Sequence, residues 1–324
     1  MKFLALMRSL NAFLLCLLLP VFTLTAADFQ KGFEAHLRGD YAAAIREWGP
    51  LAAQGDPRAQ FNIGNMFDFG KGVTEDNAQA VYWYKKSAEK GNASAQYALG
   101  WMYENAEGVK KDYGQAFIWY LKAAKKDNAA AQTNLGWMYE NGIGVEQDDA
   151  IAVDWYKKAA NLGQAEGQLN LGIMYKSGKG VDKDYLQAIF WFEKSALQGN
   201  TNAQLNLGMI YKSGKGVRTD YTQSVYWLKK AADKGHSAAL TNLGWLYENG
   251  KGVAQDYIKA AALYIKAADK GQAEGQLKLG IMYKKGRKVT QDHQEAFIWF
   301  KKAADQGLAE AQLNLGNMYK FGRG

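Results

Sequence analysis

Cysteine, histidine and long apolar runs are scarce in this sequence, and each scarcity excludes a class of protein. The one cysteine among 324 residues, Cys16, lies in an N-terminal apolar segment, so no disulfide framework can hold the rest of the chain together. His36, His236 and His293 are far apart, and neither an HExxH motif nor a Cys/His spacing typical of zinc sites is present. We expect no catalytic residue set, no metal ion and no cofactor.

Residues 1–26 are the one strongly apolar stretch, and they are predicted to be a secretory signal peptide. Lys2 and Arg8 supply a basic start, the run NAFLLCLLLPVF is too short to span a bilayer comfortably, and TLTAAD offers small residues for cleavage after Ala26 or Ala27. We therefore expect a periplasmic or secreted protein with no integral membrane segment after cleavage. An uncleaved N-terminal anchor is the alternative.

The charge of the chain is too mild to indicate a nucleic-acid partner. The formal net charge is +8, and Lys2 and Arg8 supply two of these charges. Many of the remaining lysines follow one another in segments such as YKKSAEK and WLKKAADK, which is typical of a solvated helix face. Nucleic-acid binding is not expected from an exported protein without a concentrated basic cluster.

The rest of the sequence repeats at a fixed interval of 36 residues. With Ala59 taken as position 1, the frame needs no insertion or deletion, and position 1 is Ala or Gly in every repeat. Apolar residues at positions 1, 5, 8 and 9 have helical spacing, a GxGV segment indicates a loop, and a second apolar-periodic run follows. Such a period is typical of stacked two-helix units. The predicted repeats start at residues 59, 95, 131, 167, 203, 239 and 275, with a truncated eighth at 311–324.

Two positions predict where the second helix of each repeat begins and ends. Position 18 is Asp in all seven repeats that reach it, from Asp76 to Asp292. An Asp just before an apolar-periodic run caps a helix, because its carboxylate accepts a backbone N–H that has no partner within the helix. Position 33 is Gly in six of these repeats, with Asp127 as the exception, and is expected to end the helix.

Position 6, in the middle of the first helix, is Gly in all eight repeats, from Gly64 to Gly316. Each such Gly costs about 1 kcal/mol relative to Ala, so its repetition needs a packing reason. We expect a neighbouring helix to approach closely there, with the small residue at position 22, such as Ala80 or Ser224, as its partner and the position-25 Trp beside it. The repeated residues are thus assigned to the core.

The pattern LGxMYxxGxGVxxDxxxAxxWYxKAAxxG closely resembles the Sel-1-like repeat family over residues 59–324. The resemblance implies an all-α fold, a right-handed α-solenoid of 36-residue helix-turn-helix repeats similar to tetratricopeptide repeats. It also implies a protein that binds other proteins as an adaptor or scaffold, often periplasmic or secreted in bacteria. Ala106 and Lys288 replace loop glycines and Leu263 replaces the position-25 Trp, departures that we do not expect to disturb the fold.

Residues 27–58 match the repeat only in their second half, YAAAIREWGPLAAQGDPR. Their first half lacks the GxGV loop and passes directly into the next helix. Because a solenoid needs to cover its open end, this segment is predicted to be an N-terminal capping repeat.

The variable positions of the first helix are the candidates for partner binding. Positions 3, 7 and 10 are expected to lie opposite the core positions, on the concave side of the stack by analogy with tetratricopeptide proteins. Trp at position 7 accompanies Glu at position 10 in three repeats, whereas Ile or Met accompanies Lys in three others. A Trp that packing does not need can anchor a partner. The predicted partner-binding residues are Trp101, Glu104, Trp137, Glu140, Ile173, Lys176, Met209, Lys212, Trp245 and Glu248.

We expect a monomeric, non-enzymatic and exported scaffold that binds a protein or peptide on this face. An extended peptide of basic and then acidic character would suit an acidic rim at Glu104 and Glu140 followed by Lys176 and Lys212. Two alternatives stay open through the resemblance. One is a cell-wall-related enzyme or enzyme activator, since cysteine-rich relatives have been assigned β-lactamase-like activity, although this chain lacks their cysteine pairs. The other is a secreted factor that acts on a host.

Overall fold

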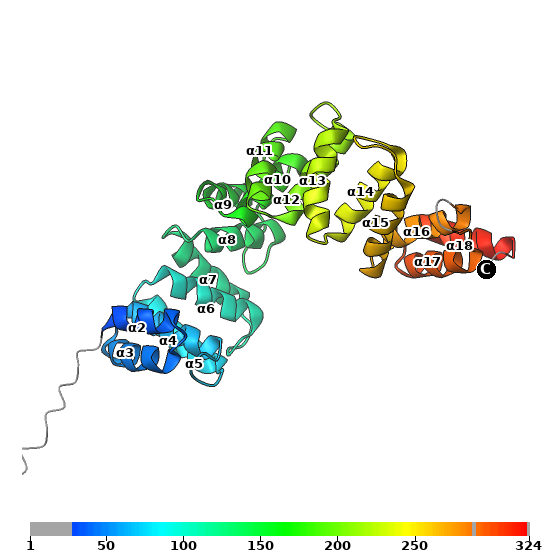
Figure 1. Ribbon diagram of the computed structural model, residues 1–324. Helices are drawn as coiled ribbons and strands as arrows, with labels where there is room; N and C mark the ends of the chain where they lie inside the picture. Colours follow the sequence, from blue (N-terminus) through cyan, green and yellow to red (C-terminus); the bar gives the residue numbers. More distant parts are fainter. Residues whose placement is uncertain (1–27, 287–289, 323–324) are drawn as a thin grey trace, which may run out of the picture. The chain divides into compact units, whose positions relative to one another are not determined.

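The computed structural model describes residues 28–286 and 290–322, and within these ranges the chain consists of seventeen α-helices and no strands. The all-α architecture predicted from the period is therefore confirmed (Figure 1). The predicted signal peptide and Lys288 lie outside the described residues. Among the helices that are described, none is long and apolar enough to cross a membrane.

Each of the seven full repeats contributes two helices, which we call helix A and helix B, and the truncated eighth contributes a helix A. The A helices of successive repeats are α4 (Pro57–Asp68), α6 (Ala93–Asn105), α8 (Ala129–Asn141), α10 (Ala165–Ser177), α12 (Thr201–Ser213), α14 (Ser237–Asn249), α16 (Ala273–Lys285) and α18 (Ala309–Lys320). The B helices are α5 (Asn77–Glu89), α7 (Tyr113–Ala124), α9 (Asp149–Asn161), α11 (Tyr185–Leu197), α13 (Tyr221–Asp233), α15 (Tyr257–Asp269) and α17 (His293–Asp305). Two further helices, α2 (Phe29–Leu37) and α3 (Tyr41–Gln54), precede them.

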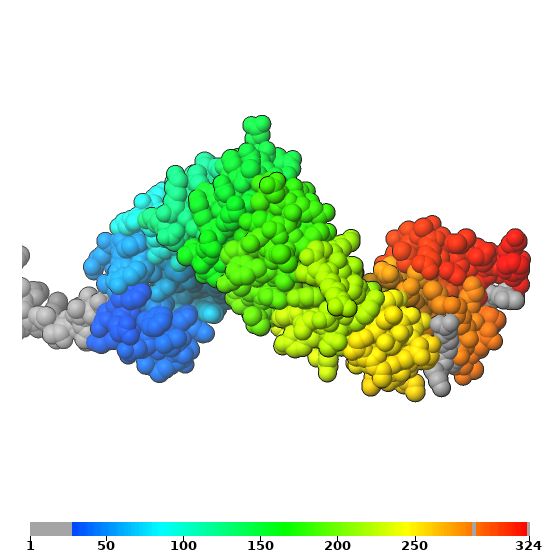
Figure 2. All heavy atoms as spheres, turned by 90° about the horizontal axis from the view of Figure 1, so that it is seen from above, coloured from blue at the N-terminus to red at the C-terminus, as the bar shows by residue number. Residues whose placement is uncertain are grey.

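The chain forms two compact units, one that ends at Lys126 and one that begins at Asp127. Within each unit, every helix packs against the next helix along the chain. In the second unit, Figure 2 shows the side chains of successive repeats in direct contact, from green to orange. The free energy of unfolding of such an arrangement is approximately the sum of the stability of each single repeat and the stabilisation from each interface between neighbouring repeats.

The pair α2 and α3 packs around a single buried tryptophan. Trp48 is 1% exposed, and its indole N–H donates a hydrogen bond to the backbone oxygen of Phe29 at 3.1 Å. A Cβ added to Gly32 would lie 2.5 Å from Trp48 Nε1, so only Gly allows α2 to approach the indole this closely. The guanidinium of Arg58 lies 4.3 Å from the centroid of the Phe29 ring and extends this cluster to α4.

The predicted helix boundaries are confirmed at both ends of helix B. The position-18 carboxylate accepts backbone N–H bonds from the first turn in each of the seven B helices, as in Gln115 N to Asp112 Oδ1 at 2.9 Å. The residue at position 33 has a positive φ, and at Asp127, where Gly is replaced, φ is 58°. Ala106 adopts a φ of 63° at the end of α6, so the loop keeps its conformation without the usual Gly.

The glycine at position 6 makes room for a side chain at position 26 of helix B. A Cβ built on Gly136 would lie 2.5 Å from Tyr156 Cδ1, and one built on Gly172 would lie 2.7 Å from Phe192 Cδ1. The expected contact with the small residue at position 22 is also present, since Ser224 Oγ donates to the backbone oxygen of Gly208 at 2.8 Å. The atoms nearest to the added Cβ, however, belong to position 26, which the sequence did not single out as a partner. Adjacent helix positions point about 100° apart, so only one of positions 25 and 26 can face the Gly. The position-25 Trp155 is only half-buried, whereas Tyr156 is fully buried.

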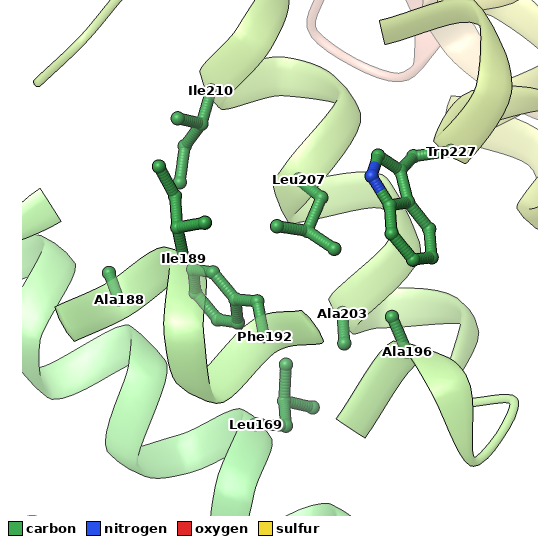
Figure 3. Close-up of a cluster of buried hydrophobic side chains, with 9 residues drawn as sticks. All are labelled: Leu169, Ala188, Ile189, Phe192, Ala196, Ala203, Leu207, Ile210 and Trp227. Atoms are coloured by element: carbon green, nitrogen blue, oxygen red, sulfur yellow. The ribbon is translucent and has the colours of Figure 1, made fainter. Parts of the chain in front are cut away.

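Each core cluster crosses the boundary between one repeat and the next. Figure 3 shows Phe192 and Leu169 of one repeat beside Leu207 and Trp227 of the next. Burial of a large apolar side chain contributes about 1.5–3 kcal/mol, so contacts of this kind hold neighbouring repeats together.

Polar side chains also tie each repeat to the preceding one. Gln204 Nε2, at position 2, donates to the backbone oxygen of Ala196 at 3.0 Å, and Lys234 Nζ, at position 32, donates to that of Gly199 at 2.8 Å. These carbonyls lie at or just after the end of helix B, where the last turn has no partners of its own. The first unit repeats the same bonds from Gln60, Gln96, Lys90 and Lys126.

Candidate functional site

The predicted partner-binding residues occupy positions 7 and 10 of five consecutive A helices, α6 to α14. At position 7, Trp101 is 40% exposed in the first unit, and Trp137 and Met209 are 38% and 39% exposed in the second. Ile173 and Trp245 are half-buried. These exposed groups contrast with the neighbouring core positions of the same helices, since Leu135 and Met138 are fully buried beside Trp137.

Position 3 contributes to packing, contrary to our expectation that it shares the open face. Leu169 is 2% exposed and Thr133 is 6% exposed. The Thr133 hydroxyl donates to Gln164 Oε1, at the start of the next A helix, at 3.2 Å. Position 3 is thus buried in the repeats that begin at residues 131, 167, 239 and 275 and half-buried in those that begin at 59, 95 and 203. We therefore keep only positions 7 and 10 as candidates.

In four repeats, the position-10 carboxylate accepts a hydrogen bond from the hydroxyl of a buried tyrosine at position 26. Tyr156 Oη lies 2.8 Å from Glu140 Oε2, in the second unit. The matching donor–acceptor pairs are Tyr84 with Asp68 at 2.8 Å, Tyr120 with Glu104 at 2.6 Å and Tyr264 with Glu248 at 2.9 Å. The predicted residues Glu104, Glu140 and Glu248 thus hold the ring that fills the space beside the position-6 Gly.

The environment of these tyrosines favours the neutral phenol. Burial, followed by the charge and hydrogen bond of the Glu140 carboxylate, raises the pKa of Tyr156 far above its ordinary value. Burial and Glu248 act on the pKa of Tyr264 in the same direction. In the first repeat, burial raises the pKa of Asp68 despite the hydrogen bond from Tyr84.

In the other three repeats with a B helix, position 26 is Phe or Leu and position 10 is Lys. Position 26 has no hydroxyl in these repeats, and the lysine ammonium group donates forward to an Asn at position 4 of the next repeat. Lys176 Nζ donates to Asn206 Oδ1 at 2.6 Å, and Lys212 Nζ donates to Asn242 Oδ1 at 2.8 Å. Lys284 makes the same bond to Asn314 at 3.2 Å.

The structure brings two groups of the predicted residues together in the second unit. Lys212 Nζ lies 4.2 Å from the centroid of the Trp245 ring, within the range of a cation–π interaction. Lys176 and Met209 line one open pocket. Trp101 and Glu104 belong to the first unit, and the other eight residues belong to the second.

The tyrosine at position 26 and the asparagine at position 4 were missed by analysis of the sequence alone. The signal was present, because the residue at position 26 changes with the residue at position 10: Tyr occurs with an acid, and Phe or Leu with Lys. Comparison of positions 7 and 10 within helix A overlooked this relation between two helices. Among the residues that the structure describes, no group of three or more His, Cys, Asp or Glu side chains could hold a metal ion.

Comparison with known families matches the Sel1 repeat eight times, at residues 57–92, 93–128, 129–164, 165–200, 201–236, 237–272, 273–308 and 309–324. The chain belongs to the Sel1 repeat family. Each Sel1 match begins two residues before our frame, at the start of helix A, and the first one begins after α3. Proteins built from Sel1 repeats are generally scaffolds for protein interactions, and the fold of this chain is that of a helical repeat solenoid.

Two solved structures of Sel1 repeat proteins are similar to this chain over most of its length. One is c5321, a protective antigen present in uropathogenic Escherichia coli strains, which is 35% identical, covers 91% of this chain and 72% of its own, and has a TM-score of 0.69. The other is a Sel1 repeat protein from Oxalobacter formigenes, which is 33% identical, covers 90% of this chain and 86% of its own, and has a TM-score of 0.69. No curated protein matches the chain.

Proposed function

We propose that this Sel1 repeat protein is an exported scaffold that binds a protein or peptide through positions 7 and 10 of its A helices. The exposure at position 7 carries the proposal. Trp101, Trp137 and Met209 are each about two-fifths exposed, although the residues beside them in the same helices are fully buried. A large apolar side chain that the fold leaves in water gains free energy when a partner covers it, and Trp is enriched among the residues that dominate binding.

Export is supported by the N-terminal sequence and by composition. The basic start at Lys2 and Arg8, the short apolar run and the small residues that follow have the order of a signal peptide. The remaining chain has no cysteine, so no disulfide bond can form in it in the periplasm or outside the cell.

The binding proposal is tested by an affinity pulldown from envelope extract with the full chain as bait. The test variant carries Trp101→Ala and Trp137→Ala, one change in each unit. The control is Phe190→Ala, which removes a 46% exposed aromatic side chain from a B helix. Equal helicity of all three baits by circular dichroism comes first. We expect a partner that wild type and F190A retain and the double variant loses. Retention by the double variant would place the binding surface elsewhere.

Export is tested separately by expression of the chain in a Gram-negative host and N-terminal sequencing of the product in each cell fraction. We expect a periplasmic or secreted product that begins at Ala27 or Asp28. A product that keeps Met1 and stays with the cytosol would contradict export and leave the binding proposal untouched.

A further inference from the structure

An open pocket of about 260 Å³ lies on the helix-A side of the second unit, between two consecutive repeats. Residues from α10, α11, α12 and the loop after α12 line it, namely Lys176, Tyr185, Asn206, Met209, Ile210, Ser213 and Lys215. This volume is below the range of 300–1,000 Å³ that is usual for small-molecule sites. Its size therefore fits one side chain of a larger partner better than a cofactor.

The pocket holds two lysine ammonium groups that no carboxylate neutralises. Lys176 is half-buried, and burial and the nearby charge of Lys215 lower its pKa. In the part of the chain that the structure describes, neither lysine forms an ion pair; the nearby Glu140 accepts from Tyr156 and pairs with Lys179 at 3.8 Å. Half-buried charges of one sign favour a ligand of the opposite sign.

The neighbouring lysine provides a comparison within the same fold. Lys212 has the same position in the next repeat and the same bond to an Asn, but its surroundings include the carboxylate of Glu274, which acts to raise its pKa. Lys212 is also covered on one side by the Trp245 ring. A second lysine, Lys278, acts on Lys212 as well, but Glu274 opposes its effect, whereas no carboxylate acts on Lys176 beside Lys215.

Hydrogen-bond geometry leaves Lys176 able to bind an anion. An ammonium group has three N–H donors, and the bond to Asn206 Oδ1 uses one of them and fixes the position of Nζ. Lys215 is exposed and can turn toward the same point. Met209 and Ile210 supply an apolar wall next to the two charges. A short aliphatic chain that ends in a carboxylate would satisfy both parts of the pocket.

We propose that this pocket binds the side-chain carboxylate of an Asp or Glu in the protein partner, with Lys176 and Lys215 as its donors and Met209 in contact with the aliphatic part of that residue. This inference rests on the proposed function, because it names one feature of the peptide that the scaffold binds. It also gives the residue at position 26 an indirect role in specificity. Phe192 has no hydroxyl to donate to an acid at position 10, and Lys176, which occupies position 10, would recognise the carboxylate of the partner.

The experiment is a selection of peptides from a random hexapeptide library, acetylated at the N-terminus and amidated at the C-terminus, on the immobilised full chain. The proteins compared are wild type, Lys176→Gln, Lys215→Gln and, as control, Lys194→Gln, which removes one exposed charge from helix B of the same repeat. We expect wild type and K194Q to enrich Asp or Glu over Asn or Gln. For the best peptide, K176Q should weaken binding by about tenfold or more, and K215Q by less, since that lysine is exposed.

The helicity of each variant is measured first, and the exposed K215Q change provides a test that does not depend on packing. Enrichment of neutral peptides, or equal affinity in wild type and K176Q, would overturn the inference while the scaffold function stands. The best peptide is also resynthesised with a free C-terminus and with its Asp or Glu replaced by Asn or Gln. Equal binding of that peptide, or displacement of the original peptide by inorganic phosphate as readily as by glutamate, would overturn the side-chain assignment. Failure of wild type to enrich any peptide, or binding of the best peptide that Trp137→Ala leaves unchanged, would count against the proposed function itself.

Discussion

The repeats that begin at Ala131 and Gly167 are neighbours in the second unit and have the same two-helix backbone, yet they present opposite charges on helix A. In the first, Tyr156 donates to Glu140 across the pair of helices. In the second, Phe192 has no hydroxyl, and Lys176 bonds instead to Asn206 of the following repeat. The charge at position 10 therefore depends on one oxygen atom at the edge of the core.

This dependence separates two types of repeat. The tyrosine repeats keep their polar bond within one helix pair, whereas the lysine repeats use theirs to join two consecutive A helices. The side chain at position 26 fills the same space in both types, because Gly at position 6 accepts Tyr156, Phe192 and Leu228 alike. Packing is thus shared by the two types, and the surface charge and the connections between repeats differ.

The largest expected effect tests the shared packing. Gly136→Ala in the tyrosine repeat and Gly172→Ala in the lysine repeat should each lower the free energy of unfolding by about 1–3 kcal/mol, because the new Cβ would overlap the ring. The control is Gly316→Ala, where an added Cβ would have no described atom within 4 Å apart from the adjoining backbone of its own helix, and a gain of up to about 1 kcal/mol is expected. Urea unfolding followed by circular dichroism measures all three. A loss in only one repeat type would show that the packing differs.

The second prediction converts one type into the other. Tyr156→Phe should cost about 1–2 kcal/mol, because it leaves the Glu140 carboxylate without its donor. Addition of Glu140→Lys should restore part of this loss, since Asn170 occupies position 4 of the next repeat, where Asn206 accepts from Lys176. Tyr82→Phe, at a 47% exposed tyrosine, is the matched control and should change little. A double variant less stable than Y156F alone would refute the proposed exchange.

The third prediction separates the two types by pH. The folded pKa of Tyr156 lies above the unfolded value near 10, so the native state holds this proton longer, and stability falls as pH rises through 10. The slope is at most about 1.4 kcal/mol per pH unit for each such tyrosine. Y156F should therefore lose less stability than wild type between pH 9.5 and 11, as seen in urea midpoints.

Lys176 should act in the opposite direction. Its folded pKa is lowered, so the native state releases this proton before the unfolded chain does, and stability rises with pH between the folded pKa and the unfolded value near 10.5. Replacement by Gln should remove that rise. Identical pH profiles for wild type, Y156F and K176Q would contradict both assignments.

The smallest expected effect concerns the bond between repeats. Asn206→Ala removes the acceptor of Lys176 and should cost about 0.5–1.5 kcal/mol. Asn170→Ala, at the same position after a tyrosine repeat, should cost less, because Glu140 is already bonded to Tyr156 within its own repeat. Thermal unfolding of the two variants side by side makes the comparison. Equal costs would mean that position 4 acts independently of the repeat type.

The period, the helix boundaries and the positions of the caps could be predicted from the sequence, because each depends on local chemistry. An Asp before an apolar run accepts N–H bonds wherever a helix follows, and Asp112 does so as expected. The contact of the position-6 Gly with position 26 could not be predicted, since Trp155 and Tyr156 are adjacent aromatic residues and the rotation of helix B decides which of them faces Gly136. Tertiary geometry decides such choices, and local propensity does not.

The candidate site was predicted in part. Trp137 and Met209 are exposed as a binding surface requires, and whether they bind a partner stays a prediction. The role of Glu140 in holding Tyr156 was missed because it joins two residues sixteen positions apart, on different helices. The forward bond from Lys176 was missed for a similar reason, because it joins two repeats.

The pairing of positions 10 and 26 has a consequence for how a gene of this kind can diverge. Tyr and Phe codons differ by one nucleotide, and so do Glu and Lys codons, so two point mutations convert one type of repeat into the other. Neither mutation alters the length of the gene or the backbone that the glycines require. A lineage can therefore rewrite the order of charges along its A helices one repeat at a time while it keeps its fold, and under the proposed function this would change the partner that it binds.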